Sequence, residues 1–142
     1  MKGYDLIIPI NNEKNIINLL DYIFKNSNDF IAILICYDDE NDISKKIYKE
    51  SKYFNSSKIK IIKNIKQGPC EAIKSGIINS SAECVIVYPA DDFNNGKLLD
   101  KMYNLYLNGC DIVCPSRFIK GGKIKNCPII KFIIVKLVSF II

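Results

Sequence analysis

Two adjacent aspartates, Asp91 and Asp92, follow a run of strand-forming residues that ends at Pro89. Carboxylates at this place would suit Mg²⁺ or Mn²⁺, which prefer oxygen ligands and are often held by one or two carboxylates together with substrate phosphates. The alternative is a solvated turn or a helix N-terminal cap, because Asp and Asn favour both. The pair therefore indicates either a cation site that binds phosphate or an ordinary turn.

The composition of the 142-residue chain narrows the chemistry further. The chain has no histidine, so a metal must be held by oxygen or sulfur, and proton transfer must use Asp, Glu, Lys, Tyr or Cys. None of the six cysteines forms a CxxC pair, which disfavours a zinc site. The net charge of +5 favours anionic partners, but the lysines are scattered and form no block typical of nucleic-acid binding. With no signal peptide visible, we expect reduced thiols and a cytoplasmic protein.

Strand-like runs and helical repeats alternate along most of the chain. The strands are expected at 5–10, 30–37, 58–64, 84–88 and 111–114, and the helices at 13–26, 43–53, 69–78 and 97–107. This alternation predicts an α/β fold with a doubly wound, mostly parallel sheet and helices on both faces. In such sheets, ligands bind at the carboxyl ends of the strands.

Acidic and polar residues follow four of the five expected strands. They are Asn11, Asn12 and Glu13 after the first, Asp38, Asp39 and Asp42 after the second, Asp91 and Asp92 after the fourth, and Ser116 and Arg117 after the fifth. Independent solvated turns would spread acids over both edges of the sheet. The gathering at one edge therefore favours a single site.

Five segments, in order, resemble the motifs of family 2 glycosyltransferases of GT-A fold. They are IIPINNEKNI (7–16), YDDEND (37–42), KQGPCEAIKSG (66–76), VYPADDF (87–93) and CPSRFIKGG (114–122). The chain is similar in particular to the dolichol-phosphate mannose synthase-like branch, which moves sugars onto polyprenyl phosphates. The resemblance implies a hexosyltransferase of cell-envelope glycan biosynthesis that uses a nucleotide-diphosphate sugar, a lipid-phosphate acceptor and Mg²⁺ or Mn²⁺ at the cytoplasmic face of a membrane.

The same resemblance implies roles for individual residues. The nucleotide cleft would be lined by Pro9, Asn11, Glu13, Asp38, Gly68 and Ala90. Asp91 aligns with the second Asp of the DXD metal motif, whereas Pro89 stands in place of the first, so that Asp92 would have to substitute as a ligand. Arg117 would bind the diphosphate or an acceptor phosphate through its guanidinium group. Lys131 lies near the position of a basic residue for the lipid phosphate.

Several of these residues have a purely structural alternative. The Asp38–Asp39 pair would suit the start of a loop, and Glu13 would favour a helix N-terminus through the helix dipole. Arg117 would suit a surface ion pair, and Lys131 a side chain that extends from an apolar surface to water. These alternatives stay open at the level of the sequence.

The last fifteen residues differ from the rest of the chain. Residues 128–142 are almost wholly apolar but shorter than the roughly 20 residues that span a bilayer. We expect a nucleotide-sugar-binding domain over 1–127 and an apolar helix over 128–142 that lies in a membrane interface or packs on absent protein. The alternative function is a truncated, catalytically weak nucleotide-binding or membrane-associated module. A phospho-acceptor receiver domain is disfavoured, because the third expected strand is not followed by an acid.

Overall fold

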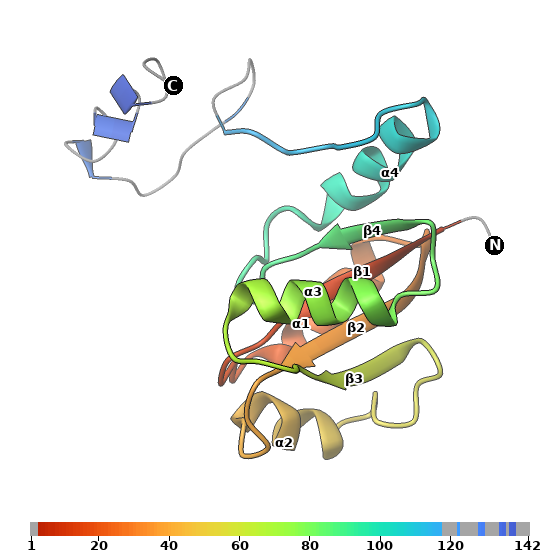
Figure 1. Cartoon of the computed structure of the whole chain (residues 1–142), viewed down its shortest axis with the longest axis vertical. Helices are drawn as coiled ribbons and strands as arrows, with labels where there is room; N and C mark the ends of the chain where they lie inside the picture. Colours follow the sequence, from red (N-terminus) through yellow and green to blue (C-terminus); the bar gives the residue numbers. More distant parts are fainter. Residues whose placement is uncertain (1–2, 118–121, 123–127, 130–133, 136, 139–142) are drawn as a thin grey trace.

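The computed structural model of the chain describes residues 3–117, 122, 128–129, 134–135 and 137–138. Strands and helices alternate along this part of the chain (Figure 1). In chain order they are β1 (Tyr4–Pro9), α1 (Ile16–Asn26), β2 (Phe30–Tyr37), α2 (Ile43–Lys49), β3 (Ile59–Lys63), α3 (Pro69–Asn79), β4 (Cys84–Val87), the 3-10 helix η1 (Gly96–Leu98) and α4 (Leu99–Leu107).

The four strands form one parallel sheet in the order β3-β2-β1-β4. Pro9 at the end of β1 is in register with Cys36 near the end of β2, and Ile7 is in register with Val87 of β4. Because all strands run the same way, their carboxyl ends lie at a single edge of the sheet. The predicted parallel α/β sheet is confirmed.

The sheet has helices on both faces, as predicted. Leu6 and Ile8 of β1 point into a large core that they share with α1, α2 and α4, whereas Ile7 points to the other face and a smaller core under α3. Figure 1 shows α3 lying across one face, with α1 behind the sheet. The central strands are buried on both faces, which explains why their sequences are continuously apolar rather than alternating.

Helix α3 approaches the sheet closely at Gly76. A Cβ atom added at Gly76 would lie 2.5 Å from Cγ2 and 2.9 Å from Cδ1 of Ile7, a fully buried side chain of β1. A larger residue at this position would therefore push the helix away from β1. The glycine therefore lets this part of α3 lie close to β1.

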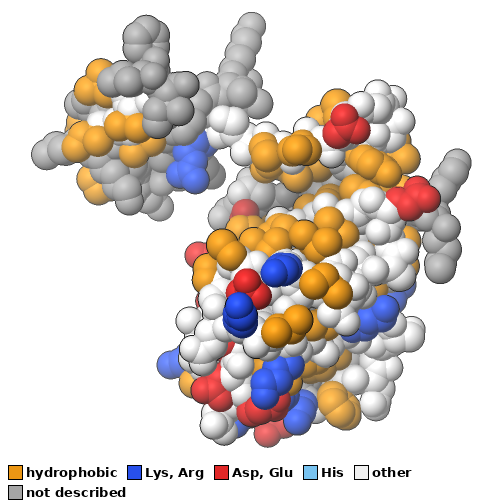
Figure 2. Space-filling model, viewed as in Figure 1, with side chains coloured by type: hydrophobic (Ala, Val, Ile, Leu, Met, Phe, Trp, Pro, Cys, Tyr) orange, Lys and Arg blue, Asp and Glu red, His pale blue; other side chains and the backbone are white. Residues whose placement is uncertain are grey.

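The expected fifth strand at 111–114 is wrong. These residues have no strand hydrogen bonds in the structure, and β4 is the last strand of the sheet. A cavity of about 390 Å³ lies between β4, α4 and residues 110–115. Residues 110–115 face the free edge of β4 across this cavity without forming the ladder that a strand requires. Figure 2 shows hydrophobic side chains on this face of the molecule. Exposed hydrophobic residues include Ile77 and Ile78 of α3 and Val87 of β4.

Two predicted helices are shorter than expected, and the C-terminal segment lies mostly outside the described residues. Helix α1 begins at Ile16 rather than at 13, and α2 ends at Lys49 rather than at 53. The predicted domain boundary at 127/128 and the candidate Lys131 fall at or within the residues that the structure does not describe. Within the described part of the chain, none of the helices has the length and hydropathy of a membrane span.

Candidate functional site

The carboxyl edge of the sheet brings together the loops that carry nearly all the predicted site residues. Asp38 follows β2 and Asp91 follows β4, with β1 between them. The two strands are therefore separated by two strand spacings, about 10 Å. The exception is Arg117, an exposed residue in a segment with no partner in the sheet, so the sheet topology does not position it at this edge.

Asp38 is half-buried, and both of its carboxylate oxygens have protein partners. Oδ1 accepts a hydrogen bond from Asn64 Nδ2 at 2.7 Å, and Oδ2 accepts one from the backbone N–H of Gly68 at 2.9 Å. Asp38 thus fixes the β3–α3 loop against the end of β2. Asn64 is only 7% exposed, and its Oδ1 has no hydrogen-bond partner. The sequence offered no signal for Asn64 beyond a polar residue at the end of a strand-like run.

Gly68 has a backbone conformation that only glycine adopts readily. Its φ is 112° and its ψ is 158°, and it precedes Pro69, the first residue of α3. A Cβ at this position would meet no atom within 4 Å, so the requirement for glycine comes from the dihedral angles and not from crowding. In this conformation the Gly68 N–H points to Asp38.

The β1–α1 loop carries Pro9, Asn11 and Glu13. Pro9 ends β1 and is half-buried, Asn11 is exposed, and Glu13 is half-buried. The backbone N–H of Glu13 donates to Ser44 Oγ at 2.6 Å. Since α1 begins only at Ile16, Glu13 lies before the helix rather than in its first turn, which does not support the alternative role at a helix N-terminus.

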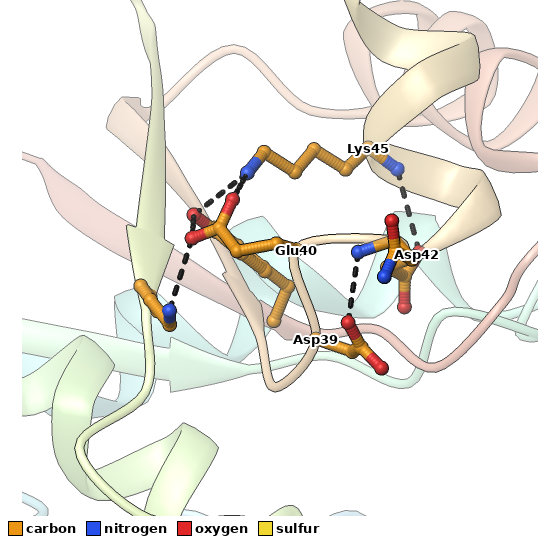
Figure 3. Close-up of polar contacts among 7 residues, drawn as sticks. Asp39, Glu40, Asp42 and Lys45 are labelled. Atoms are coloured by element: carbon orange, nitrogen blue, oxygen red, sulfur yellow. Dashed lines mark hydrogen bonds and ion pairs between the residues drawn. The ribbon is translucent and has the colours of Figure 1, made fainter.

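A network of opposite charges lies next to Asp38 on the β2–α2 loop. Lys45 pairs with Glu40 and donates to the Tyr37 hydroxyl at 3.0 Å, and Lys63 lies 3.1 Å from Glu40. Figure 3 shows the Lys45 side chain extending to Glu40 while the backbone of the same residue meets Asp42. Hydrogen bonds from Lys45 and then Lys63 lower the pKa of Glu40 to about 2, and the bond to Glu40 raises the pKa of Lys45. This network holds the loop that contains Asp38.

The two aspartates after β4 have different environments. The Asp92 carboxylate accepts hydrogen bonds from the backbone of Asn94 and Asn95 at 2.8 and 3.0 Å and from the Asn95 side chain at 2.7 Å. Asp92 therefore has the turn role that was the alternative to metal binding. Asp91 is exposed and makes no hydrogen bond or ion pair with the described residues. Ala90, by contrast, is 9% exposed and belongs to the large core.

The donor atoms at this edge fit a cation only when a ligand completes the coordination. No group of three or more His, Cys, Asp or Glu side chains in the described ranges could hold a metal ion by itself. Mg²⁺ commonly takes one or two carboxylates and completes its coordination with phosphate oxygens and water. Asp91 fits that pattern, because its exposed carboxylate has no protein partner in the described part of the chain.

Comparison with known proteins adds the family. The model of glycosyl transferase family 2 matches residues 5–139, which is nearly the whole of the chain. The chain belongs to glycosyl transferase family 2. The resemblance expected from the five motifs is confirmed, and membership implies the GT-A fold, in agreement with the parallel sheet.

A curated relative is similar over most of this family 2 chain. The dolichol-phosphate mannosyltransferase of Pyrococcus furiosus is 26% identical over 132 residues, which cover 92% of the chain. The chain spans 38% of the length of that relative.

Proposed function

We propose that the chain binds a nucleotide-diphosphate sugar at the carboxyl edge of its sheet and transfers the hexose to a polyprenyl phosphate. Membership of glycosyl transferase family 2 and the similarity to a dolichol-phosphate mannosyltransferase support this proposal. The observation that carries it is the common location of the loops after β1, β2, β3 and β4, which contain Asp38, Gly68 and Asp91.

In this proposal the individual residues take the roles that the family resemblance implies. Asp38 meets the nucleoside, Gly68 and Ala90 line the cleft, and Pro9, Asn11 and Glu13 form its wall. Asp91 would hold a divalent cation together with the donor diphosphate. When bound, such a cation neutralises the negative charge that develops on the departing diphosphate. We assign Asp92 only a secondary contact, because its carboxylate already accepts three N–H groups of the following turn.

The sequence has no histidine to act as a general base, and a phosphate acceptor does not require one. A phosphate oxygen of the acceptor attacks the anomeric carbon, and the bond from that carbon to the nucleoside diphosphate breaks. The acceptor phosphate is already an anion, so no general base is needed to activate it. Arg117, which is exposed, binds the diphosphate or the acceptor phosphate, and its guanidinium group suits two parallel hydrogen bonds.

We further propose that the C-terminal segment contacts a membrane surface. Four of the described hydrophobic residues of this segment, Ile129, Ile134, Leu137 and Val138, are 78%, 55%, 58% and 47% exposed, whereas Val135 is half-buried. Exposed apolar side chains beside basic residues are typical of helices that lie in the interface of a membrane with anionic lipids. Co-sedimentation with vesicles of phosphatidylglycerol and phosphatidylcholine, lost on removal of residues 128–142, would support this contact.

The test of donor binding is a melting-temperature panel with UDP, GDP and CDP, each with Mn²⁺ or Mg²⁺. We expect one of these nucleotides to raise the melting temperature in a metal-dependent manner, and the Asp91→Ala variant to lose the metal-dependent part. No stabilisation by any of them would contradict the proposal. Transfer of labelled hexose to polyprenyl phosphate then separates an active enzyme from the alternative, a module that binds nucleotide without turnover.

A further inference from the structure

Asp42 is a buried carboxylate on the β2–α2 loop whose partners are all backbone N–H groups. Only 3% of the residue is exposed. Oδ1 accepts from Ser44 N at 2.7 Å and Lys45 N at 3.4 Å, which caps the first turn of α2. Oδ2 accepts from the backbone N–H of Asn12 at 2.9 Å, on the loop after β1. One carboxylate thus joins two loops that are 30 residues apart in the sequence.

Two further hydrogen bonds join the same loops. The Ile43 N–H donates to Asn12 Oδ1 at 3.1 Å, and the Glu13 N–H donates to Ser44 Oγ at 2.6 Å. Asn12 also has a φ of 58°, the only positive φ of a residue other than glycine in the described ranges. Asparagine adopts this left-handed conformation more readily than most residues, and the bonds to Asp42 and Ile43 hold it in place here. We call these five residues, Asn12, Glu13, Asp42, Ile43 and Ser44, the Asp42 network.

We propose that Asp42 is a positioning residue for nucleotide binding. It holds the β1–α1 loop, which carries Asn11 and Glu13, in fixed register with the β2–α2 loop, which carries Asp38. This inference rests on the proposed function, because these three residues are assigned there to the nucleotide cleft. Asp42 itself is too buried to contact the ligand, so its effect must pass through Asn12 and Glu13.

The substitution Asp42→Asn tests this role selectively. An asparagine keeps one acceptor oxygen, which can still cap α2. The amide nitrogen would then face the Asn12 N–H, where a donor meets a donor and the bond between the loops is lost. If the β1–α1 loop then adopts the conformation that binds nucleotide only about a tenth of the time, the affinity for nucleotide falls about tenfold.

A second variant and a matched control separate positioning from stability. Ser44→Ala removes the bond to the Glu13 N–H from a fully buried serine. Ser27→Ala makes the same change at the opposite edge of the sheet, where Ser27 is 1% exposed and lies 2.6 Å from both the Tyr4 hydroxyl and Asp100 Oδ1. We expect both substitutions to lower the melting temperature, Ser27→Ala at least as much as Ser44→Ala, because the Ser27 hydroxyl loses two hydrogen-bond partners and the Ser44 hydroxyl one.

The measured quantity is the dissociation constant of the nucleotide that stabilises the unmodified protein most among UDP, GDP and CDP. It is determined by calorimetry with Mn²⁺, at a temperature where every variant is folded. We expect Asp42→Asn to weaken binding about tenfold, Ser44→Ala to weaken it less, and Ser27→Ala to leave it unchanged. Amide hydrogen exchange at Asn12 and Glu13, measured without nucleotide, should speed up in Asp42→Asn.

The possible failures are distinguishable. Nucleotide binding that is unchanged in Asp42→Asn despite faster exchange, or that is weakened equally by Ser27→Ala, would overturn the positioning role and leave the proposed function intact. If the unmodified protein binds none of the three nucleotides, the proposed function is wrong, and the positioning role is overturned with it.

Discussion

The close contact between α3 and β1 predicts that Gly76→Ala destabilises the protein. Helix propensity alone predicts the opposite sign for the change in the free energy of unfolding. In an exposed helix, Gly76→Ala would stabilise the protein by about 1 kcal/mol, because alanine is the better helix former. Here the added methyl group would lie 2.5 to 2.9 Å from three carbon atoms of Ile7, which is fully buried and cannot move into free space. Overpacking of this kind costs about 1–3 kcal/mol.

The contact distances favour the overpacking cost over the gain in helix propensity, and we expect Gly76→Ala to lower the free energy of unfolding by up to about 2 kcal/mol. The assay is urea denaturation followed by circular dichroism. In an Ile7→Ala background, which removes all three contacting atoms, the same substitution should become stabilising by about 1 kcal/mol. A single variant that is more stable than the unmodified protein would show that α3 does not lie as close to β1 as the structure has it.

Two further predictions concern the loops of the site. The pKa of Glu40 is lowered from 4.5 to about 2, so this residue stabilises the fold above pH 4.5 and the contribution is lost as the pH falls toward 2. Urea midpoints between pH 6 and pH 3 should therefore fall less steeply for Glu40→Gln than for the unmodified protein, and identical slopes would refute the pairing. Gly68→Ala should cost about 1–3 kcal/mol through its φ of 112°. Gly109→Ala is the control, because Gly109 has a φ of 95° but lies outside the site. It should lower the free energy of unfolding by a similar amount without weakening nucleotide binding. A Gly68→Ala variant as stable as the unmodified protein would contradict the strain at Gly68.

The parallel sheet was predictable because its central strands are buried on both faces. The run FIAILICY, which forms β2, has no polar alternation, and a strand with helices on both sides needs none. The same reasoning failed at 111–114, where three apolar residues follow Asp111. Strand formation there requires backbone hydrogen bonds to the edge of β4, and residues 110–115 face that edge across a cavity without making them. Sequence patterns report the character of a strand but not the presence of its partner.

The candidate site was predictable as a set of loops but not as a set of contacts. The order of strands and acids along the chain was enough to gather Asp38 and Asp91 at one edge. The hydrogen bonds of the turn at 92–95 occupy the Asp92 carboxylate and leave that of Asp91 available. The spacing of residues in the sequence does not predict the geometry of this turn. The contacts of Asn64 and Asp42 join residues that are far apart in the sequence, so a single sequence carries no signal for them.

The most direct test of the account is to locate nucleotide binding on the protein by NMR. In a titration of the ¹⁵N-labelled protein with UDP, GDP and CDP in the presence of Mg²⁺, we expect saturable shift changes for one nucleotide at the amides of Asn11, Glu13, Asp38, Gly68 and Asp91. The amides of Ser27 and Ser81, at the opposite edge of the sheet, should not respond. Changes confined to that opposite edge, or no saturable change with any of the three nucleotides, would contradict the claim that the carboxyl edge is a sugar-nucleotide site.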